Sequence, residues 1–555
     1  MRTGAGAGSR EPRAEGRSTR RLAFAMGICA GLAVVVTLDG PGLTIDEPLD
    51  VRPGRTYLEV LQDRGWHFFD RAVVEKVFRD NAEHPPLGRW LLGIASVVGE
   101  PFEVLWKGPD PTGQYVLAGR LAPALAFAAL AGLVTQVAGR RWGPAAGAGA
   151  AFALVSMPRV FAHAHLAALD TFLSLFWTLA LVTGERSVRA KHPASAMAAA
   201  GAVWALALLT KIHAWFLLPI LGTWAFLWLP PRRALAVMAI WSVVGITLFW
   251  LGWPWLWHDP LTRLQAYWGT GVARQTIFVE YFGRVVADRD VPWHYPWFYF
   301  AATVPAGLQA LGALGVVHGW KNRRADPFPL LLVGTIVAFL ALFSARVPVY
   351  DGERLFLHVF PAWSLLIGLG FGWLWNHPLA GFRARIVLAL FLVVQGYGLV
   401  ALHPFGLSYY NALVGGLPGA ERLGLELTYW NDPVDQVLLD QLARKARPGD
   451  SAALVPTLYP GQGIRTTNRA LERRRIILAD EQEGTRAEWV VLSRRTAYWR
   501  PEIKDRLRLG EGRRVASRSR QGVWLSALWH FPAPQTRRRS GAVPTGSIPP
   551  PFRPP

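Results

Sequence analysis

Apolar segments close to 20 residues in length recur along the first 402 residues of the chain and then stop. A segment of that length crosses the hydrocarbon core of a bilayer as a helix, in which the backbone polar groups pair within the segment. The composition agrees, because 52% of the 555 residues are hydrophobic and only 17% are charged. A soluble chain is normally less apolar and more charged. The sequence therefore predicts a polytopic α-helical membrane protein.

The apolar runs predict about eleven spans. They lie at residues 22–38, 116–138, 143–163, 170–184, 194–210, 213–230, 234–253, 298–318, 327–345, 356–375 and 386–402. If the chain starts inside, each loop predicted to be inside is basic, as the positive-inside rule requires. Those loops contain Arg140, Arg141, Arg186, Arg189, Lys191, Arg232, Arg233, Lys321, Arg323, Arg324, Arg383 and Arg385.

This charge pattern predicts a cytoplasmic N-terminus, residues 1–21, followed by an uncleaved signal anchor, with the C-terminus outside the plasma (inner) membrane. The transmembrane module, 22–402, carries two long outer segments, 39–115 and 254–297. Within the first, residues 86–99 are apolar but too short to cross, so we expect a helix at the interface.

The region 403–530 has a different character, with short β-rich runs at Ser451–Pro456, Arg475–Ala479 and Trp489–Ser493. These runs, separated by polar or helical stretches, predict a small extracytoplasmic α/β domain. Residues 531–555 are rich in Pro, Arg, Ser and Gly, which bury too little apolar surface to fold, so a disordered tail is expected.

The formal net charge of +21 raises nucleic-acid binding as an interpretation. The basic residues lie in short loops between spans and in the C-terminal domain, and no nucleic-acid-binding module is recognisable, so we expect no nucleic-acid partner. The single cysteine, Cys29, lies within the first span and allows no intramolecular disulfide.

Some basic residues are exceptions to the topology rule. Lys211, Arg346 and Arg354 fall on short outer connections, and Arg120 lies near the outer end of the second span. One interpretation is a salt bridge, or snorkelling of the side chain to lipid headgroups. The alternative is a site for an anionic group embedded in the membrane.

Two carboxylates, Asp46 and Glu47, follow the first span in Thr-Ile-Asp-Glu-Pro, at the start of an outer segment. A carboxylate there can act as a general base toward a hydroxyl, because burial and a neighbouring like charge raise its pKa. The alternative is a solvated loop start or a helix cap.

Further polar residues lie near the outer surface. His84 precedes Pro85 and Pro86, and is either a ligand or a structural or headgroup contact. Asp170 lies with His163 and His165 at the junction of the third and fourth spans, without the spacing of a zinc site, so the metal is left unknown. The many aromatic residues of 254–297 form either an interfacial belt or a surface that stacks on a sugar or prenyl chain.

Several motifs occur in a fixed order from about residue 40 to 435. They are the Asp46-Glu47 pair, Pro-Pro-Leu after His84, Ala-Gly-Arg-Leu-Ala-Pro at Arg120, Leu-Ala-Ala-Leu-Asp at Asp170, Leu-Leu-Thr-Lys at Lys211, Glu-Tyr-Phe-Gly-Arg at Arg284, Glu-Arg-Leu-Phe at Arg354, His-Pro-Phe-Gly-Leu-Ser-Tyr-Tyr-Asn from His403, and Tyr429-Trp430. Together they resemble the polyprenyl-phosphate-dependent glycosyltransferases of the GT-C class, the family of protein O-mannosyltransferases and bacterial aminoarabinose transferases.

The resemblance implies a GT-C fold and transfer of a sugar, with inversion, from a polyprenyl-phosphate donor to a hydroxyl of a protein, lipid or glycan on the outer face. It implies a catalytic set of Asp46, Glu47 and Asp170, with Asp46 as the general base. It also implies a cationic set for the donor phosphate, which consists of Arg284, Arg354, Lys211, Arg120 and His84.

The chain departs from the aminoarabinose-type pattern at two places. His84 stands where those proteins tend to have Lys, and Glu280-Tyr281-Phe282 stands where they have His. Two other functions stay open beside the transferase. A transporter or flippase would need polar or broken helices at the bilayer midplane, and a non-catalytic assembly protein would lack Asp46 or the basic set.

Overall fold

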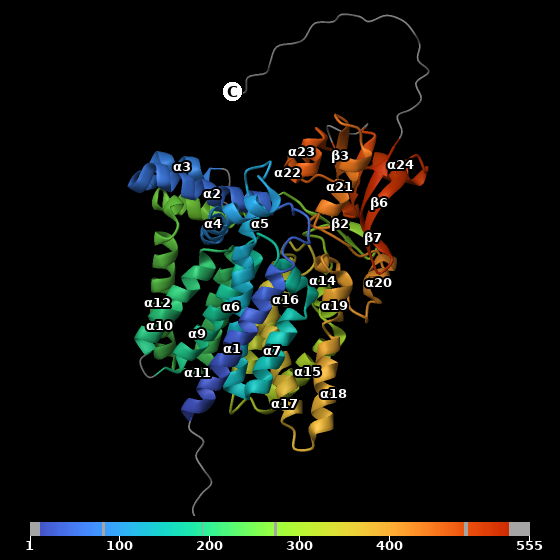
Figure 1. The fold of residues 1–555 in the computed structure, drawn as a ribbon. Helices are drawn as coiled ribbons and strands as arrows, with labels where there is room; N and C mark the ends of the chain where they lie inside the picture. Colours follow the sequence, from blue (N-terminus) through green and yellow to red (C-terminus); the bar gives the residue numbers. More distant parts are fainter. Residues whose placement is uncertain (1–11, 80–83, 191–192, 271–274, 482–486, 532–555) are drawn as a thin grey trace, which may run out of the picture.

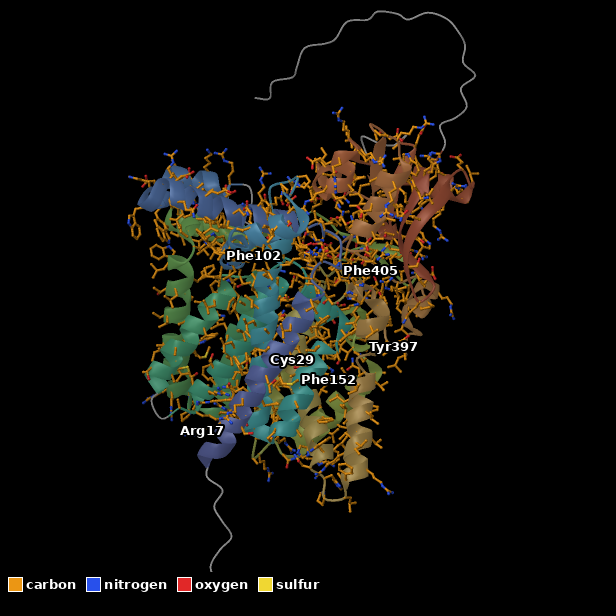
Figure 2. All side chains as sticks on the ribbon, viewed as in Figure 1. Arg17, Cys29, Phe102, Phe152, Tyr397 and Phe405 are labelled. Carbon is orange, nitrogen blue, oxygen red and sulfur yellow. The ribbon has the colours of Figure 1, made fainter. Side chains whose placement is uncertain are left out.

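The computed structural model describes residues 12–79, 84–190, 193–270, 275–481 and 487–531. A long bundle of helices carries, at one end, a layer of shorter helices and a sheet domain (Figure 1). Arg17 near the start of α1 (Pro12–Val35) lies at the opposite end of the bundle from Phe102 and Phe405 (Figure 2). The predicted tail, apart from Phe531, lies outside the described residues.

Each predicted span is occupied by a helix or a pair of helices. These are α1, α5 (Val116–Gly119) with α6 (Leu121–Trp142), α7 (Pro144–Val155) with α8 (Pro158–His163), α9 (Asp170–Val188), α10 (Pro193–Leu208), α11 (Leu217–Trp228), α12 (Pro231–Leu251), α14 (Tyr295–Ala302) with α15 (Ala306–Lys321), α16 (Phe328–Ser344), α17 (Phe360–Trp375), and α18 (Phe382–Val394) with α19 (Tyr397–Leu402).

Five of the described helices are long and apolar enough to cross a membrane, judged by length and composition alone. The number is six if the pair α14 and α15, bent by 110°, is one span. Four shorter apolar helices fall below that length. The multi-pass architecture is thus supported, and the count of eleven spans stays a prediction.

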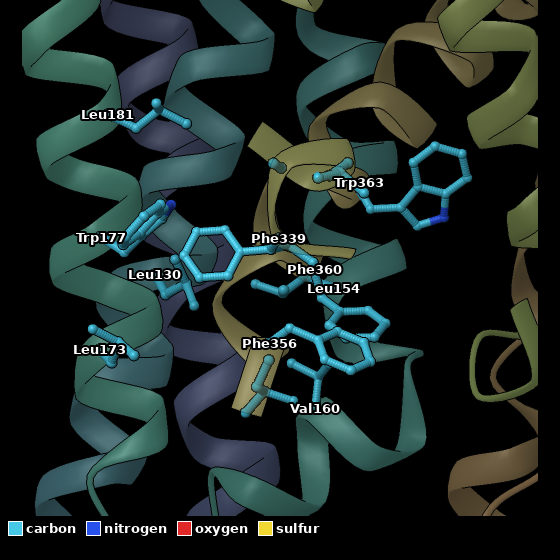
Figure 3. Packing of buried hydrophobic residues seen from close by; sticks show 14 of the residues in the cluster. Leu130, Leu154, Val160, Leu173, Trp177, Leu181, Phe339, Phe356, Phe360 and Trp363 are labelled. Carbon is cyan, nitrogen blue, oxygen red and sulfur yellow. The ribbon is translucent and has the colours of Figure 1, made fainter. Parts of the chain in front are cut away.

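Burial separates the centre of the bundle from its rim. The apolar stretch that includes α17 is wholly buried, whereas the corresponding stretch of α18 and α19 is mostly exposed and suits a lipid-facing position. Around α17, side chains such as Trp177, Phe339, Phe356 and Phe360 interdigitate (Figure 3). The ring centroids of Trp177 and Phe339 are 5.0 Å apart, within the range of favourable aromatic pairs.

The segment 39–115, predicted to lie outside the membrane, forms a helical layer of α2 (Glu47–Arg64), α3 (Arg71–Phe78) and α4 (Leu87–Lys107), hereafter the outer helical layer. A helix is therefore present at the predicted position, and it continues to Lys107, where Gly108 ends it with a φ of +83°. Its place at the membrane interface stays a prediction. Helices α2 and α4 cross closely, because a Cβ atom on Gly54 would lie 2.0 Å from the carbonyl oxygen of Arg89. This crossing sets the start of α2 beside the start of α4.

The second outer segment contains α13 (Pro260–Thr270) and a hairpin of β1 (Phe278–Tyr281) and β2 (Arg284–Ala287). Its two turn residues, Phe282 and Gly283, both have positive φ, as a tight hairpin turn requires. The backbone N–H of Phe278 donates to the hydroxyl of Tyr498 at 2.9 Å, so the hairpin contacts the C-terminal domain.

The C-terminal domain is built on a five-stranded mixed sheet in the order β4-β3-β5-β7-β6. Its strands are β3 (Ser451–Val455), β4 (Ile477–Asp480), β5 (Trp489–Ser493), β6 (Arg513–Arg520) and β7 (Val523–His530), with α21 (Gln436–Lys445) and α24 (Pro501–Arg508) beside them. The three predicted β-rich runs are confirmed as the parallel strands β3, β4 and β5. The antiparallel β6–β7 hairpin was missed, because Arg-Arg-Val-Ala-Ser-Arg-Ser-Arg shows no clear alternation of apolar and polar residues.

The segment that precedes the sheet runs back along the transmembrane module. The backbone N–H of Gly42 donates to the carbonyl of Asp432 at 2.8 Å, and that of Ile45 to the carbonyl of Trp430 at 3.3 Å. This part of the predicted C-terminal domain therefore packs with the start of α2.

Candidate active site

A cavity of about 330 Å³, hereafter the reaction cavity, lies where the outer helical layer, the bundle and the C-terminal domain meet. Five of the predicted site residues line it, namely Asp46, His84, Asp170, Lys211 and Arg354. Their side chains come from the residue before α2, the loop before α4, the start of α9, the connection between α10 and α11, and the connection before α17. The fold therefore brings together residues that are spread over 309 positions.

Arg354 is the centre of this cluster. Its Nη2 donates to Asp46, its Nη1 donates to Asp351 at 2.9 Å, and its Nε lies 3.6 Å from a carboxylate oxygen of Asp170. The guanidinium carbon lies 3.9 Å from the ring centroid of Trp430, a cation–π geometry. One planar cation thus holds three carboxylates, which a point-charge ammonium does less well.

Lys211 forms the second buried cation of the reaction cavity. Its Nζ donates to Oδ1 of Asp170 at 2.6 Å, and both side chains are almost fully buried. Asp170 is the first residue of α9, where the partial positive charge of a helix N-terminus favours a carboxylate. The two opposite charges neutralise each other in this buried pair. The Asp170 carboxylate lies beside both cations, Lys211 and Arg354.

Asp50 and His84 complete the wall on the side of α2 and α4. Arg89 donates from Nε to Asp50 at 3.1 Å, yet burial raises the pKa of Asp50 to about 6. Burial also lowers the pKa of His84 well below its ordinary value, helped by the nearby charge of Arg89. Nδ1 of His84 is buried and has no hydrogen-bond partner in the described part of the chain. His84 is therefore neutral at physiological pH and offers a hydrogen-bonding group rather than a charge.

The C-terminal domain closes the reaction cavity with residues that follow its parallel strands. Leu458 and Tyr459 come after β3, and Arg495 and Tyr498 come after β5. The carboxyl ends of parallel strands meet at one sheet edge, which is where such sheets place binding residues. Sequence reasoning missed Arg495, whose only signal was its position just after a predicted strand.

Arg495 is buried and donates from Nη2 to Asp351 at 2.9 Å and from Nη1 to the carbonyl of Tyr429. Asp351 accepts from Arg354 through its other oxygen. A continuous chain of ion pairs therefore links the C-terminal domain to the cluster around Arg354.

Glu47 and Arg120 lie outside the lining of the reaction cavity, and the roles predicted for them are not supported by their contacts. Nε and Nη2 of Arg120 bind the Glu47 carboxylate at 2.7 and 2.8 Å. The remaining donors go to the backbone carbonyls of Leu38, Pro41 and Gly42. Glu47 also accepts from backbone N–H groups, so this buried pair fixes the turn before α2 and has no donor left for a phosphate.

Arg284 also lies outside the reaction cavity. It is exposed on β2, at the end of the hairpin turn. The residues of this segment that line the cavity come instead just before β1, at Gln275, Thr276 and Ile277. The predicted phosphate role of Arg284 is therefore not supported by its position.

The two histidines near Asp170 have structural partners. Nε2 of His163 lies 3.2 Å from the hydroxyl of Tyr429, and His165 binds the hydroxyl of Thr37 and the carbonyl of Phe161. Among the described residues no group of three or more His, Cys, Asp or Glu side chains is arranged to hold a metal ion.

Residues 83–258 match the family model described as dolichyl-phosphate-mannose-protein mannosyltransferase. This range contains His84, Asp170 and Lys211 of the reaction cavity. The match confirms the resemblance that the ordered motifs predicted. Over residues 83–258 the chain is therefore similar to a family of mannosyltransferases.

The chain also aligns with solved structures at low identity. ArnT from Cupriavidus metallidurans in the apo state is 17% identical over 92% of this chain and 98% of its own, with a TM-score of 0.47. The same protein bound to undecaprenyl phosphate is 17% identical over 91% and 97%, with a TM-score of 0.49. The Archaeoglobus fulgidus oligosaccharyltransferase with Zn and sulfate is 13% identical over 84% and 68%, with a TM-score of 0.42. No curated protein matches the chain.

Proposed function

We propose that this protein transfers a sugar from a polyprenyl-phosphate donor to a hydroxyl of an acceptor, with inversion, at the extracytoplasmic face of the plasma membrane. The observation that carries the proposal is the convergence of one carboxylate, Asp46, and two cations, Arg354 and Lys211, in a single cavity at the end of the bundle that carries the C-terminal domain. The family match over residues 83–258 favours a transferase over a transporter or an assembly protein.

Lys211 and Arg354 hold the donor phosphate in this proposal. Both are buried cations at the outer end of apolar helices, which suits a phosphate whose lipid tail lies in the bilayer. An apolar groove of about 410 Å³ between α11 and α16 lies along the membrane part of the bundle and suits the polyprenyl chain. Phe216, which ends the short helical segment after Lys211, lines this groove.

Asp46 acts as the general base. In the structure its carboxylate accepts from Nη2 of Arg354. A donor phosphate that binds Arg354 competes for the same nitrogen and releases the carboxylate to accept the proton of the acceptor hydroxyl. The acceptor oxygen then bonds to the anomeric carbon as the bond from that carbon to the phosphate oxygen breaks. The phosphate leaves with both electrons of that bond, and the two cations stabilise its charge.

The test is a comparison of wild type with Asp46→Asn, which removes the base and nearly preserves its shape. The full-length protein in detergent is supplied with a panel of polyprenyl-phosphate sugars and an acceptor mixture, and transfer of the sugar is measured. We expect transfer to fall by about a hundredfold or more, as for loss of a general base, while donor binding is kept. The matched control is Asp505→Asn, on the exposed face of α24.

Two results would count against the proposal. Equal transfer by Asp46→Asn and wild type would remove Asp46 from the mechanism. Failure of the wild type to use any donor in the panel, with the protein folded and acceptors present, would favour the transporter or assembly interpretations.

A further inference from the structure

A second and larger cavity, of about 840 Å³, lies between α2 and α3 in the outer helical layer. We call it the α2–α3 cavity. Its charged lining consists of Arg52, Arg64, Lys76, Arg79, Arg465 and a single carboxylate, Asp63. Five cations therefore face one anion around a space large enough for several sugar residues or a lipid headgroup.

Four of the cations of this cavity have no partner among the residues that the structure describes. Arg52, Arg64, Lys76 and Arg79 make no hydrogen bond or ion pair with another residue in the described ranges. The acidic residue of α3 is used elsewhere, because Glu75 binds Arg71 at 2.9 Å and Arg263 at 3.2 Å. A concave surface with one sign of charge raises the local concentration of ligands of the opposite sign.

The α2–α3 cavity adjoins the reaction cavity. Leu49 lines both, and it lies within the first turn of the α2 region, where its N–H donates to the carbonyl of Asp46 at 3.0 Å. On the other side, the guanidinium of Arg465 lies 5.3 Å from the ring centroid of Tyr459, which lines the reaction cavity. Leu49 is therefore a wall common to the two cavities, and the contact between Arg465 and Tyr459 joins the lining of one to the lining of the other.

We propose that the α2–α3 cavity is the acceptor subsite and that it binds phosphate groups of the acceptor. This inference rests on the proposed glycosyltransferase function. Lys211 and Arg354 already account for the phosphate of the donor, so a second cationic cavity serves the other substrate. Arginine forks match phosphate oxygens in pairs, and several of them fix a polyanion in one orientation. Its free hydroxyl then enters the reaction cavity beside Asp46.

Binding is measured directly with the full-length protein in detergent, with tripolyphosphate as the soluble probe in isothermal titration calorimetry. A second arm uses nanodiscs that contain phosphatidylglycerol or only phosphatidylcholine, to test a lipid headgroup as the source of the phosphate. The variant is Arg64→Gln/Lys76→Gln, which removes one cation from each wall. The matched control is Arg71→Gln, a cation on the same α3 helix that pairs with Glu75 and Asp259 instead.

We expect the double variant to bind one of the two probes about tenfold more weakly than wild type, and Arg71→Gln to bind it as wild type does. Loss of tripolyphosphate binding indicates a soluble phosphorylated acceptor, and loss confined to phosphatidylglycerol nanodiscs indicates a lipid acceptor. Equal binding of both probes by the two variants and wild type overturns the inference.

The same preparations keep this result separate from the transferase proposal. Release of sugar from the donor to water depends on the reaction cavity alone, and we expect the double variant to retain it. If wild type releases and transfers no sugar, the transferase proposal fails whatever the probes show. If it transfers sugar and the double variant uses acceptors as well as wild type does, the acceptor subsite is elsewhere.

Discussion

The guanidinium of Arg354 donates a hydrogen bond to the carboxylate of Asp46, although 308 positions separate the two residues in the chain. The contact joins the proposed base to the proposed phosphate ligand. A carboxylate and a phosphate compete for the same nitrogen of Arg354. When no donor is bound, the Asp46 carboxylate therefore stays hydrogen-bonded to Arg354. In the proposed mechanism, binding of the donor and activation of the base are thereby coupled.

This coupling predicts a difference between two substitutions of one residue. Arg354→Gln removes the charge, and Arg354→Lys keeps it but cannot meet Asp46, Asp351 and Asp170 together, because an ammonium lacks the planar fork. We expect donor binding to weaken by about tenfold or more in Arg354→Gln and by less in Arg354→Lys, with transfer impaired in both. Titration with undecaprenyl phosphate measures donor binding by each variant, and the transfer assay measures sugar transfer.

Arg284→Gln is the control for these variants, because Arg284 is exposed on β2 and lies outside the reaction cavity. Its donor binding should equal that of wild type. A loss of donor binding in Arg284→Gln as large as in Arg354→Gln would show that the hairpin, rather than the buried cluster, holds the phosphate.

Substitution in the buried Arg120–Glu47 pair should lower stability without changing the transfer rate, unlike substitution in the reaction cavity. Arg120→Met leaves the carboxylate of Glu47, which is fully buried, without its cation, and such a change costs about 3–5 kcal/mol. We expect less folded protein and a lower midpoint of thermal unfolding. The specific transfer rate per folded molecule should stay close to that of wild type. A folded Arg120→Met protein that has lost donor binding would return Arg120 to the phosphate site.

The helices were predictable because the physical signal is local. Apolar runs of spanning length identify helices such as α6 and α12, and the β-rich runs identify β3 and β5. The β6 strand gave no such signal, since its residues are mostly Arg and Ser and its pairing with β7 depends on the hairpin turn at Gln521 and Gly522.

The site was only partly predictable, for a different reason. The sequence gives the same signal for three basic residues at predicted outer span ends, which are Lys211, Arg354 and Arg120. Only the folded structure shows that Arg120 is enclosed by Glu47 and three carbonyls, whereas Lys211 and Arg354 line the reaction cavity. Arg495 had only the weak signal of following a predicted strand, because its contact with Asp351 joins residues 144 positions apart.

Glu426 makes stability depend on pH in a defined direction. It is buried 3.7 Å from Nε of Arg495, and burial raises its pKa from 4.5 to about 8. A carboxyl whose folded pKa is raised contributes stability below its unfolded pKa, and that stability is lost as the pH rises through the folded pKa. We expect the midpoint of thermal unfolding to fall as the pH rises from about 5 to about 9.

Glu426→Gln mimics the protonated form and should reduce this decline. Thermal unfolding of wild type and variant across the same pH range measures the difference. Glu511→Gln is the control, since Glu511 is half exposed and pairs only at the surface with Arg506. A decline that is as steep in Glu426→Gln as in wild type would assign the pH dependence to other groups, of which buried Asp432 is the first candidate.

In the proposed mechanism Arg495 acts through Asp351 and Arg354, which makes it a positioning residue. Arg495→Gln leaves Asp351 with one cation instead of two, and it leaves Glu426 without its neighbouring charge. We expect the protein to lose stability, because the buried Asp351 carboxylate has lost a partner and Glu426 is harder to ionise. We also expect kcat to fall, because Arg354 is no longer held in place through Asp351.

A second substitution separates these two effects. At a pH of about 9, above the pKa of about 8 that Glu426 has beside Arg495, adding Glu426→Gln to Arg495→Gln removes the cost of charging a buried carboxyl, so the midpoint of thermal unfolding should recover in part. In contrast, kcat should stay low because Asp351 still lacks its second partner. If kcat recovers together with stability, Arg495 has only a structural role. If kcat stays low while the KM for the donor is unchanged, the C-terminal domain sets the geometry of the reaction cavity through this one arginine.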